Sequence, residues 1–463
     1  MNNTLDKHID ETTKRTALLV AIASSFLGPF MVSASNIALP AIALDFRMDA
    51  VLLTLVPMAY ILLGAIFLLP LGRIADIYGR KKLFAWGGGI FAASSILCGL
   101  APSGEMLIVF RAFQGIGSSM IFGISVAILM SVFPASARGK VLGITVSAVY
   151  VGLAAGPLLG GFMTEQLGWR SIFLFSGFFG SAITVSVVWK LKGEWAEARG
   201  EPFDIIGAGA YSIAIAAVMY GFHLLPGNRG FLFLLIGLAG LWLFVKWEMR
   251  VRFPVLEWKL FRHNRVFILS NLATLINYGA TYAIGFLISL YLQYTKGLSP
   301  QNAGLVLMAQ PIVQAVFSPY AGKLSDRVEP QVVASCGMGL TVIGLALFVF
   351  LGQETPLWFI VGTLALHGLG FALFSSPNTN AVMGSVDKRL YGVASGIVST
   401  MRLLGNSFSI GTATIVFSIY IGQVRITPER YPAFLTSVRV IFAVFFLLCL
   451  GGVYASLARG KMR

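Results

Sequence analysis

The sequence predicts an all-α integral membrane protein with about fourteen spans, arranged as two pseudo-symmetric six-helix bundles with two additional helices between them. Of its 463 residues, 57% are hydrophobic and only 11% are charged, and the mean hydropathy is +0.82. Soluble domains are about half apolar and about a quarter charged. Two further observations support this fold class: long apolar runs recur along the whole chain, and short motifs of its first half reappear in its second.

The apolar runs give the number and order of the spans. A run of about 18 or more apolar residues, bounded by charge, proline or glycine, indicates a helix that crosses the bilayer. Six such runs lie near residues 17–37, 51–71, 83–100, 106–133, 141–163 and 171–189, and two follow near 205–225 and 231–247. Six more lie near 266–294, 303–322, 332–351, 357–380, 391–421 and 434–457.

These runs divide the chain into two bundles and their connecting segments. We expect an N-terminal tail (1–16), a first bundle (17–190), a connector (191–204), two additional helices (205–248), a basic segment (249–265), a second bundle (266–457) and a C-terminal tail (458–463). The charged stretch 246–265, which contains two tryptophans, has the composition of an amphipathic helix lying in the membrane interface.

The distribution of lysine and arginine sets the predicted orientation. With the N-terminus inside the cell, about 25 of the 34 cations fall in cytoplasmic segments, so both termini are expected to be cytoplasmic. The net charge of +15 then reflects membrane topology, and no nucleic-acid partner is expected because the cations are spread over short loops. The three cysteines lie in apolar runs and lack the spacing of metal ligands or paired disulfides.

The most polar stretch between two apolar runs is the loop LGRIADIYGRKK at 71–82. Residues this polar cannot lie in hydrocarbon, so a tight turn at the membrane surface is predicted. A related stretch, GKLSD, occurs at 322–326, and QGIG at 114–117 reappears as HGLG at 367–370. Such a repeat indicates two related halves that move against each other around a central site. We expect Asp76 and the arginines to latch the two halves at the cytoplasmic side. The residues with an expected gating role are Gly72, Arg73, Asp76, Gly79, Arg80, Lys81, Gly322 and Asp326.

Two arginines fall inside predicted spans, Arg111 in the fourth and Arg402 in the thirteenth. A cation in the bilayer costs at least a few kcal/mol, so each must face protein or a water-filled cavity. Gln114 and Asn406 follow them by about one helical turn and share their helix faces. We expect these four residues to bind substrate or to couple the transport cycle. The alternative is that the arginines are structural and tie helix ends together.

Further polar residues recur at helical spacing in the ninth and tenth spans. We expect a polar and aromatic surface for substrate, formed by Asn271, Thr274, Tyr278, Tyr282, Gln310 and Gln314. Hydrogen bonding between helices is the alternative for any one of them. Gly156 and Pro157 in the fifth span are expected to act as a hinge or gate, because glycine permits close helix packing and proline removes a backbone hydrogen bond.

Several motifs resemble the major facilitator superfamily, specifically its fourteen-span drug:H+ antiporter branch. The loop at 71–82 resembles the superfamily's signature loop, RAFQGIG at 111–117 its conserved-arginine motif, and AGPLLGG at 155–161 the antiporter motif of exporters. NIALP at 36–40 and RLLG at 402–405 are similar to further patterns of this branch. The resemblance implies alternating access, an outer seal formed by the motif in the fifth span, and proton exchange as the energy source.

One position departs from that branch. Its first span normally carries an aspartate nine residues before the proline of the NIALP motif, and Met31 stands there in this chain. No carboxylate lies at the centre of a predicted span, so the usual proton carrier and partner of cationic drugs is missing. His367 is a candidate replacement because an imidazole titrates near neutral pH. The alternative is a neutral histidine that is hydrogen-bonded between helices.

The sequence therefore predicts a secondary active exporter of small amphipathic compounds, similar to multidrug efflux proteins, in a prokaryotic plasma (inner) membrane. We expect a small-molecule substrate, a surrounding lipid bilayer, no cofactor besides the proton gradient, and function as a monomer. The alternative is a dedicated exporter or facilitator of an anionic, neutral or lipid-like compound without standard proton antiport. A membrane sensor that does not transport is a more remote alternative. An enzyme is not expected, because no nucleophile–base pair, metal-ligand spacing or phosphate loop occurs.

Overall fold

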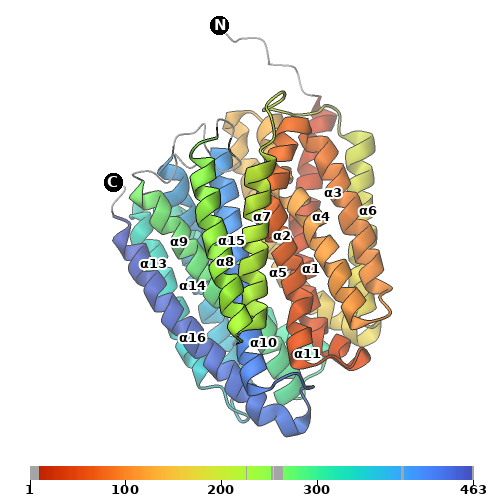
Figure 1. The fold of residues 1–463 in the computed structure, drawn as a ribbon, viewed down its shortest axis with the longest axis vertical. Helices are drawn as coiled ribbons and strands as arrows, with labels where there is room; N and C mark the ends of the chain where they lie inside the picture. The colour runs from red at the N-terminus through yellow and green to blue at the C-terminus, as the bar shows by residue number, and fades with distance from the viewer. Residues whose placement is uncertain (1–9, 226, 252–253, 255–263, 387–390, 461–463) are drawn as a thin grey trace.

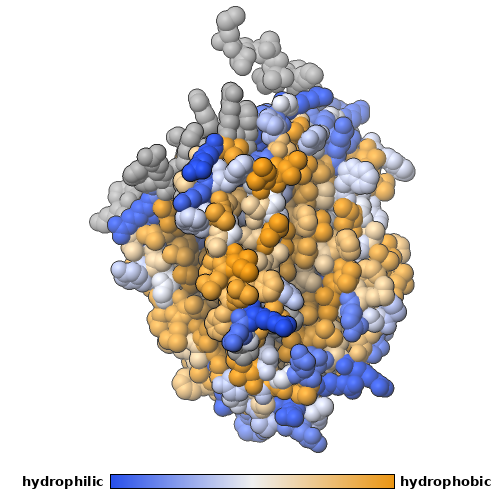
Figure 2. Space-filling model, viewed as in Figure 1, coloured by the Kyte–Doolittle hydropathy of each residue, from blue (hydrophilic) through white to orange (hydrophobic). Residues whose placement is uncertain are grey.

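The computed structural model describes residues 10–225, 227–251, 254, 264–386 and 391–460, and these residues form helices and connections without a strand. Fourteen helical segments are long and apolar enough to cross a membrane, which confirms the predicted number of spans. Figure 2 shows apolar side chains over the middle of the visible face and polar ones toward both ends. This distribution is that of an all-α integral membrane protein.

The helices follow the predicted order. The first bundle comprises α1 (Glu11–Asp45), α2 (Ala50–Tyr78), α3 (Arg80–Gly99), α4 (Gly104–Val132), α5 (Ala135–Gln166) and α6 (Arg170–Lys190). The additional helices are α7 (Ile205–Leu224) and α8 (Asn228–Glu248). The second bundle comprises α9 (Arg265–Thr281), α10 (Ala283–Leu290), the π-helical turn η2 (Tyr291–Thr295), α11 (Pro300–Leu307), α12 (Ala309–Arg327), α13 (Pro330–Val349), α14 (Leu357–Gly384), α15 (Tyr391–Tyr420), the short η4 (Pro428–Arg430) and α16 (Tyr431–Ala458).

Polar side chains at the ends of the apolar runs start several helices. The Asp49 carboxylate accepts a hydrogen bond from the Leu52 backbone N–H (2.7 Å) at the start of α2, and Asp204 accepts one from Gly207 (2.9 Å) at the start of α7. Such caps satisfy backbone donors that have no partner within the helix. Because the helices continue into polar residues, several are longer than the apolar runs that predict them.

The ninth and tenth spans are each divided into shorter helices, which the sequence analysis did not predict. The run 266–294 corresponds to α9, α10 and η2, and the run 303–322 corresponds to α11 and α12. Tyr282 lies at the junction of α9 with α10, and Met308 lies at the junction of α11 with α12. Pro311, three residues after Met308, is a sequence signal for the second break, because proline removes a backbone hydrogen bond of the preceding turn; no proline lies near the first break. Most of the predicted interfacial helix at 246–265 lies outside the described residues.

The two bundles repeat the same helix packing. In the first, α4 packs on α2 and α3, and α1 packs on α5; in the second, α14 packs on α12 and α13, and α9 packs on α15. The repeated glycine motifs lie at equivalent contacts. A Cβ atom at Gly115 would lie 2.1 Å from the Tyr60 carbonyl oxygen, and one at Gly368 would lie 2.3 Å from the Gln310 carbonyl oxygen. The sequence repeat therefore marks two equivalent six-helix bundles.

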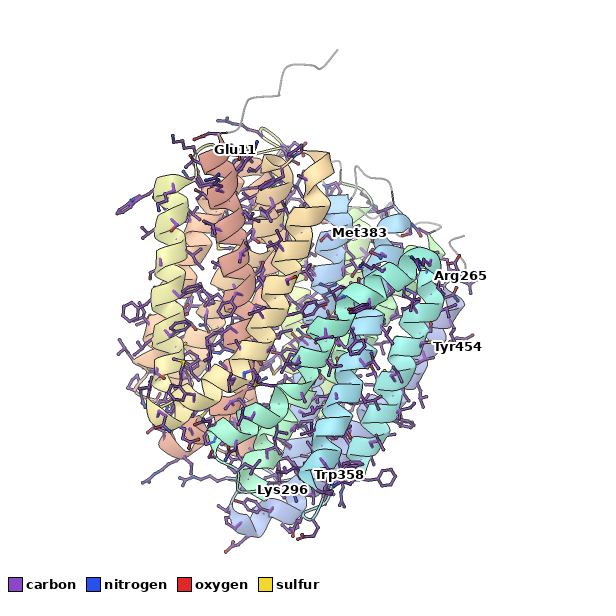
Figure 3. The ribbon with its side chains drawn as sticks, turned by 180° about the vertical axis from the view of Figure 1, so that it is seen from behind. Glu11, Arg265, Lys296, Trp358, Met383 and Tyr454 are labelled. Carbon is purple, nitrogen blue, oxygen red and sulfur yellow. The ribbon has the colours of Figure 1, made fainter. Side chains whose placement is uncertain are left out.

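Close packing joins the bundles at one end of the molecule. Helix α1 begins and α16 ends at the same end, here called the terminal end, and the other is the opposite end (Figure 1). At the opposite end a Cβ atom at Gly304 of α11 would lie 2.1 Å from the Pro157 carbonyl oxygen of α5, and one at Gly161 would lie 2.5 Å from the Pro300 carbonyl oxygen. Figure 3 shows α5 and α12 separating from this region toward the terminal end.

Polar contacts reinforce this junction, which we call the clasp. The Thr54 and Thr414 hydroxyls lie 2.7 Å apart across the two bundles. The other hydrogen bonds that join the bundles here run from Ala50 N to Val424 O (3.0 Å), Ser289 Oγ to Asn36 O (2.9 Å), Gln293 Nε2 to Ile37 O (3.0 Å) and Gln301 N to Glu165 Oε2 (3.0 Å). The clasp therefore combines close backbone approach with a small number of hydrogen bonds.

The additional helices cover one of the two seams between the bundles. Helix α7 packs on α8, on α2 of the first bundle and on α15 of the second. The Tyr211 hydroxyl donates to the Ala65 carbonyl of α2 (3.0 Å), and the Phe222 ring packs edge-on against Phe408 of α15, with ring centres 5.2 Å apart. Figure 1 shows α7 and α8 in front of the bundles. The other seam, between α5 and α11–α12, lies on the face seen in Figure 3.

Replacing Gly304 with valine is expected to open the opposite end, because the new side chain cannot fit against the Pro157 carbonyl oxygen. Spin labels at Arg47 and Glu354, exposed residues of the two bundles near this end, should then show a longer mean distance by double electron–electron resonance. Gly339→Val in α13 is the matched control, because a Cβ atom there meets no atom within 4 Å. An unchanged distance in Gly304→Val would contradict the clasp.

Candidate substrate site and gate

A polar cluster centred on Arg402 of α15 lies at the boundary between the bundles. Its Nη2 donates to the Thr379 hydroxyl of α14 (3.1 Å), and its guanidinium carbon lies 5.5 Å from the ring centre of Tyr278. Arg402 also interacts electrostatically with Tyr150 of α5, which belongs to the first bundle. Arg402 Nε and Asn406 Oδ1 are buried without a hydrogen-bond partner among the described residues. The cluster therefore keeps unused hydrogen-bonding capacity.

Aromatic and amide side chains surround this arginine. The Tyr278 ring packs edge-on against Phe371 of α14, with ring centres 5.1 Å apart. The Tyr150 hydroxyl contacts the side chains of Gln314 and Ser318 on α12. The structure thus brings together four of the residues that the sequence analysis selected, namely Tyr278, Gln314, Arg402 and Asn406. Their role in binding a substrate stays a prediction.

Arg111 occupies a different environment, inside the first bundle. The residue is only 1% exposed; its Nε donates to the Val56 carbonyl of α2 (3.3 Å) and its Nη1 to the Gln114 side-chain oxygen. Gln114 in turn donates to the Ser95 hydroxyl of α3 (2.6 Å), and the guanidinium carbon lies 4.4 Å from the centre of the Tyr60 ring. These contacts tie α4 to α2 and α3. Arg111 also lies within electrostatic reach of Tyr282 of the second bundle, and its role in substrate binding or coupling stays a prediction.

The other polar residues of α9 divide between packing and the bundle boundary. Asn271 donates to a carbonyl one turn earlier in its own helix (2.9 Å), and the Thr274 hydroxyl accepts from Asn378 of α14 (2.8 Å). Thr274 therefore joins α9 to α14, whereas the hydrogen bond of Asn271 lies within α9 and its Oδ1 is buried without a partner among the described residues. A role of either residue in binding a substrate stays a prediction. Tyr282 is placed at the boundary, because it interacts electrostatically with Arg111 of the first bundle.

His367 lies within the second bundle and away from the Arg402 cluster. It is 1% exposed, and its ring stacks on Phe348 of α13 with centres 5.4 Å apart. Phe348 packs in turn on Phe442 of α16. The half-buried Gln310 contributes its backbone carbonyl to the contact between α12 and α14. Proton transfer through His367 stays a prediction, and its surroundings are apolar.

The signature loop is held by a network around Arg80. Its Nη2 lies 2.7 Å from Asp76 Oδ1, and its Nη1 lies 2.6 Å from Glu197 Oε1 and 2.7 Å from the Ser131 hydroxyl. These partners all belong to the first bundle or to the connector 191–204. In this conformation Asp76 therefore pairs within its own half. The latch between the two halves concerns a different conformation and stays a prediction.

The connector 191–204 binds along the loop through carboxylates, and we call it the carboxylate strap. Glu194 accepts hydrogen bonds from the backbone N–H groups of Lys81 (2.8 Å) and the next residue (3.2 Å) at the start of α3. Glu201 forms an ion pair with Arg73, and Glu197 binds Arg80. Carboxylates are favourable at a helix N-terminus because unpaired N–H groups point toward them.

Glycine is required at one position of the loop. Gly79 has a φ of 121°, and a Cβ atom there would lie 2.4 Å from the Glu194 side-chain carbon. Gly72 differs, because a Cβ atom there would meet nothing within 4 Å. In the second loop Gly322 approaches Ser376 of α14, and Asp326 lies in α12 with its side chain outside the described part of the chain.

The sequence analysis missed the strap and Tyr150. The strap carried a usable signal, since Glu194, Glu197 and Glu201 recur at three- and four-residue spacing in a connector whose charge complements the loop. Tyr150 carried none, because an aromatic residue within an apolar run is ordinary. Among the described residues no group of three or more His, Cys, Asp or Glu side chains could hold a metal ion.

Two equivalent six-helix bundles that are clasped at one end and carry polar residues on their boundary define a secondary transporter of the alternating-access class. Comparison with known sequences gives the family. The chain belongs to the Major Facilitator Superfamily, whose sequence pattern matches residues 21–410 and 270–459.

The chain is similar to characterised bacterial transporters. It is 30% identical over 413 residues to the riboflavin transporter RibZ of Clostridioides difficile (strain 630), with 89% of each chain covered. It is also 30% identical to the multidrug resistance protein Stp and to the drug efflux pump JefA, both of Mycobacterium tuberculosis. These matches cover 88% and 87% of this chain and 77% and 81% of the relatives.

Solved structures share the fold at low sequence identity. A bacterial homologue of the human lysosomal transporter Spinster superposes with a TM-score of 0.72 at 15% identity, with 97% of this chain and 98% of that chain covered. The nucleoside transporter NupG superposes with a TM-score of 0.66 at 12% identity, with 97% and 100% covered.

Arg111→Ala is expected to destabilise the protein by about 2–4 kcal/mol, because it leaves buried partners unsatisfied and removes the contact with the Tyr60 ring. The measurement is the thermal unfolding temperature of the detergent-purified protein. Arg402→Ala, at a half-buried position with fewer partners, is the comparison and should lower that temperature less. A larger loss in Arg402→Ala would contradict this assignment of roles.

Removing two strap carboxylates in the double variant Glu194→Gln/Glu197→Gln is expected to release the strap from the loop. Loss of the Glu197–Arg80 ion pair and weakening of the backbone hydrogen bonds of Glu194 cost roughly 1–2 kcal/mol in total, so amide hydrogen exchange in 191–204 should become about tenfold faster. Mass spectrometry of the exchanged protein measures this, and Arg199→Gln, an exposed change in the same segment, is the control. Equal exchange in the double variant and the wild type would show that the carboxylates do not hold the strap.

Proposed function

We propose that this transporter exports small amphipathic compounds across the plasma (inner) membrane, with the terminal end and the strap facing the cytoplasm. The observation that carries the proposal is the single boundary between two equivalent bundles, clasped at the outer end and holding the Arg402 cluster. The excess of cations in the segments of the terminal end supports this orientation.

Alternating access then requires the clasp to open while the terminal end closes. The hydrogen bonds of the clasp contribute about 0.5–1.5 kcal/mol each, and shifting a two-state equilibrium from about 1:99 to 99:1 takes about 5.5 kcal/mol. The hydrogen-bond contribution to the clasp is therefore of a size that substrate or ion binding can offset. In the outward-open state the loop around Asp76 would latch the two halves at the cytoplasmic side.

Export is supported by the motif at 155–161 and by the names of two relatives. Gly161 and Pro157 of this motif form the clasp, which would seal the outer side while substrate enters from the cytoplasm. Stp is named a multidrug resistance protein and JefA a drug efflux pump. The second candidate function is the dedicated export or facilitated passage of an anionic or neutral compound. Arg402, which has no carboxylate beside it among the described residues, favours this candidate, and so does the relative named as a riboflavin transporter.

We propose the proton gradient as the energy source, and a monomer as the functional unit. The described carboxylates lie at helix ends or in connections, and Met31 is fully buried where the related antiporters have an aspartate. A proton would therefore have to move by a route that does not use the first span. Dependence of transport on the pH gradient therefore distinguishes the proton-coupled exporter from the dedicated exporter or facilitator.

Uptake into everted membrane vesicles tests the proposal. A panel of amphipathic anions, neutral compounds and cations is offered with the respiratory chain energised, with and without nigericin, which collapses the pH gradient. We expect at least one compound to accumulate above vector-control vesicles, with loss of uptake in nigericin and in Gly304→Val but not in Gly339→Val. Uptake that persists in nigericin would select the second candidate, and a panel without any uptake would contradict export.

A further inference from the structure

One seam between the bundles is covered and the other is open. Helix α7 bridges α2 and α15 on the first seam, as Tyr211 and Phe222 show. On the second seam α5 faces α11 and α12 directly, and none of the other described helices packs extensively on both sides of it. The protein is thus asymmetric, although its two bundles are equivalent.

An apolar groove of about 270 Å³ lies in this open seam, between α5 and α12. Small side chains, among them Ala154 and Ala315, leave the space. Three of its lining residues, Val151, Ile312 and Val316, are 57%, 43% and 53% exposed, so the groove is open on the outer surface of the bundles. In a bilayer that surface faces lipid. Tyr150 is the only polar side chain in the lining.

Tyr150 lines the groove and lies within electrostatic reach of Arg402, so the groove borders the Arg402 cluster. Its hydroxyl contacts Gln314 and Ser318, and it interacts electrostatically with Arg402. Arg402 Nε has no hydrogen-bond partner within the described part of the chain. The described carboxylates all lie at helix ends or in connections, away from this position in α15. A charge held among helices is stabilised by an opposite charge and destabilised by one of its own sign.

We propose that the groove and the Arg402 cluster form one binding site for an amphipathic carboxylate. The carboxylate binds the Arg402 guanidinium beside Tyr150, and its apolar chain lies in the groove between α5 and α12, which admits it from the surrounding lipid. The inference rests on the proposed function, in that the bound compound is the class of compound exported. Cationic amphiphiles should not bind this site, because their charge would lie beside the like charge of Arg402.

Binding of a short amphiphile in three charge states tests the site. Radiolabelled octanoate, octanamide and octylammonium are measured by scintillation proximity on the full chain in phosphatidylcholine nanodiscs, with empty nanodiscs subtracted. We expect octanoate to bind at least tenfold more tightly than the other two. Arg402→Gln should lose at least tenfold in octanoate affinity and Arg402→Lys less, because lysine keeps the charge. Arg425→Gln, at an exposed position of the same bundle, is the control and should bind as the wild type does.

A second variant tests the groove separately from the charge. Ala154→Phe fills the groove, so it should weaken octanoate binding while butyrate, whose chain is too short to use the groove, binds as in the wild type. Equal octanoate binding in wild type and Arg402→Gln, or a preference for octylammonium, would overturn the site. Octanoate binding through Arg402 without transport of any carboxylate in vesicles would leave the site standing but overturn the claim that the bound compound belongs to the class that is exported.

Discussion

The close approach of α5 to α11 is the contact on which the rest of the structure depends. Gly161 and Gly304 bring two backbones together at the opposite end, where any side chain would collide. The bundles consequently meet there and diverge toward the terminal end (Figure 3). The Arg402 cluster lies on the boundary that this arrangement leaves between them. Opening and closing can then be a rotation of two preformed bundles rather than a refolding of either.

The two intramembrane arginines differ in the number of side chains and backbone groups that they contact. Arg111 is buried and meets a backbone carbonyl, a glutamine and an aromatic ring within its own bundle. Arg402 meets one hydroxyl and the face of Tyr278, and its Nε has no partner among the residues that the structure describes. At the surface, the carboxylates of the strap pair with Arg73 and Arg80 of the signature loop and so hold the loop to the first bundle. The strap also leads directly into α7, so the position of the loop is connected to the helices that cover one seam.

Much of the fold was predictable from the sequence, since spans are set by the length of apolar runs and the halves by repeated motifs. The pairs Gly115 with Gly368 and Gly72 with Gly322 mark equivalent places in the two bundles. Helical spacing places residues on one face of a helix, but it does not say which neighbour that face meets, so Arg111 and Arg402 could not be told apart. The break at Tyr282 has no proline beside it, whereas the break at Met308 could have been inferred from Pro311. The strap depends on a connector folding back over a loop, which is a tertiary contact without a periodic pattern.

The central claim is that the clasp must open for each transport cycle. The Thr54 and Thr414 hydroxyls are 2.7 Å apart across the clasp, so cysteines at both positions can form a disulfide once the native Cys98, Cys336 and Cys449 are replaced. The most direct measurement is transport by this double-cysteine protein in vesicles, before oxidation, after oxidation and after reduction. We predict normal transport before oxidation, no transport after oxidation and recovered transport after reduction. Undiminished transport by protein that is fully cross-linked at 54 and 414 would contradict it.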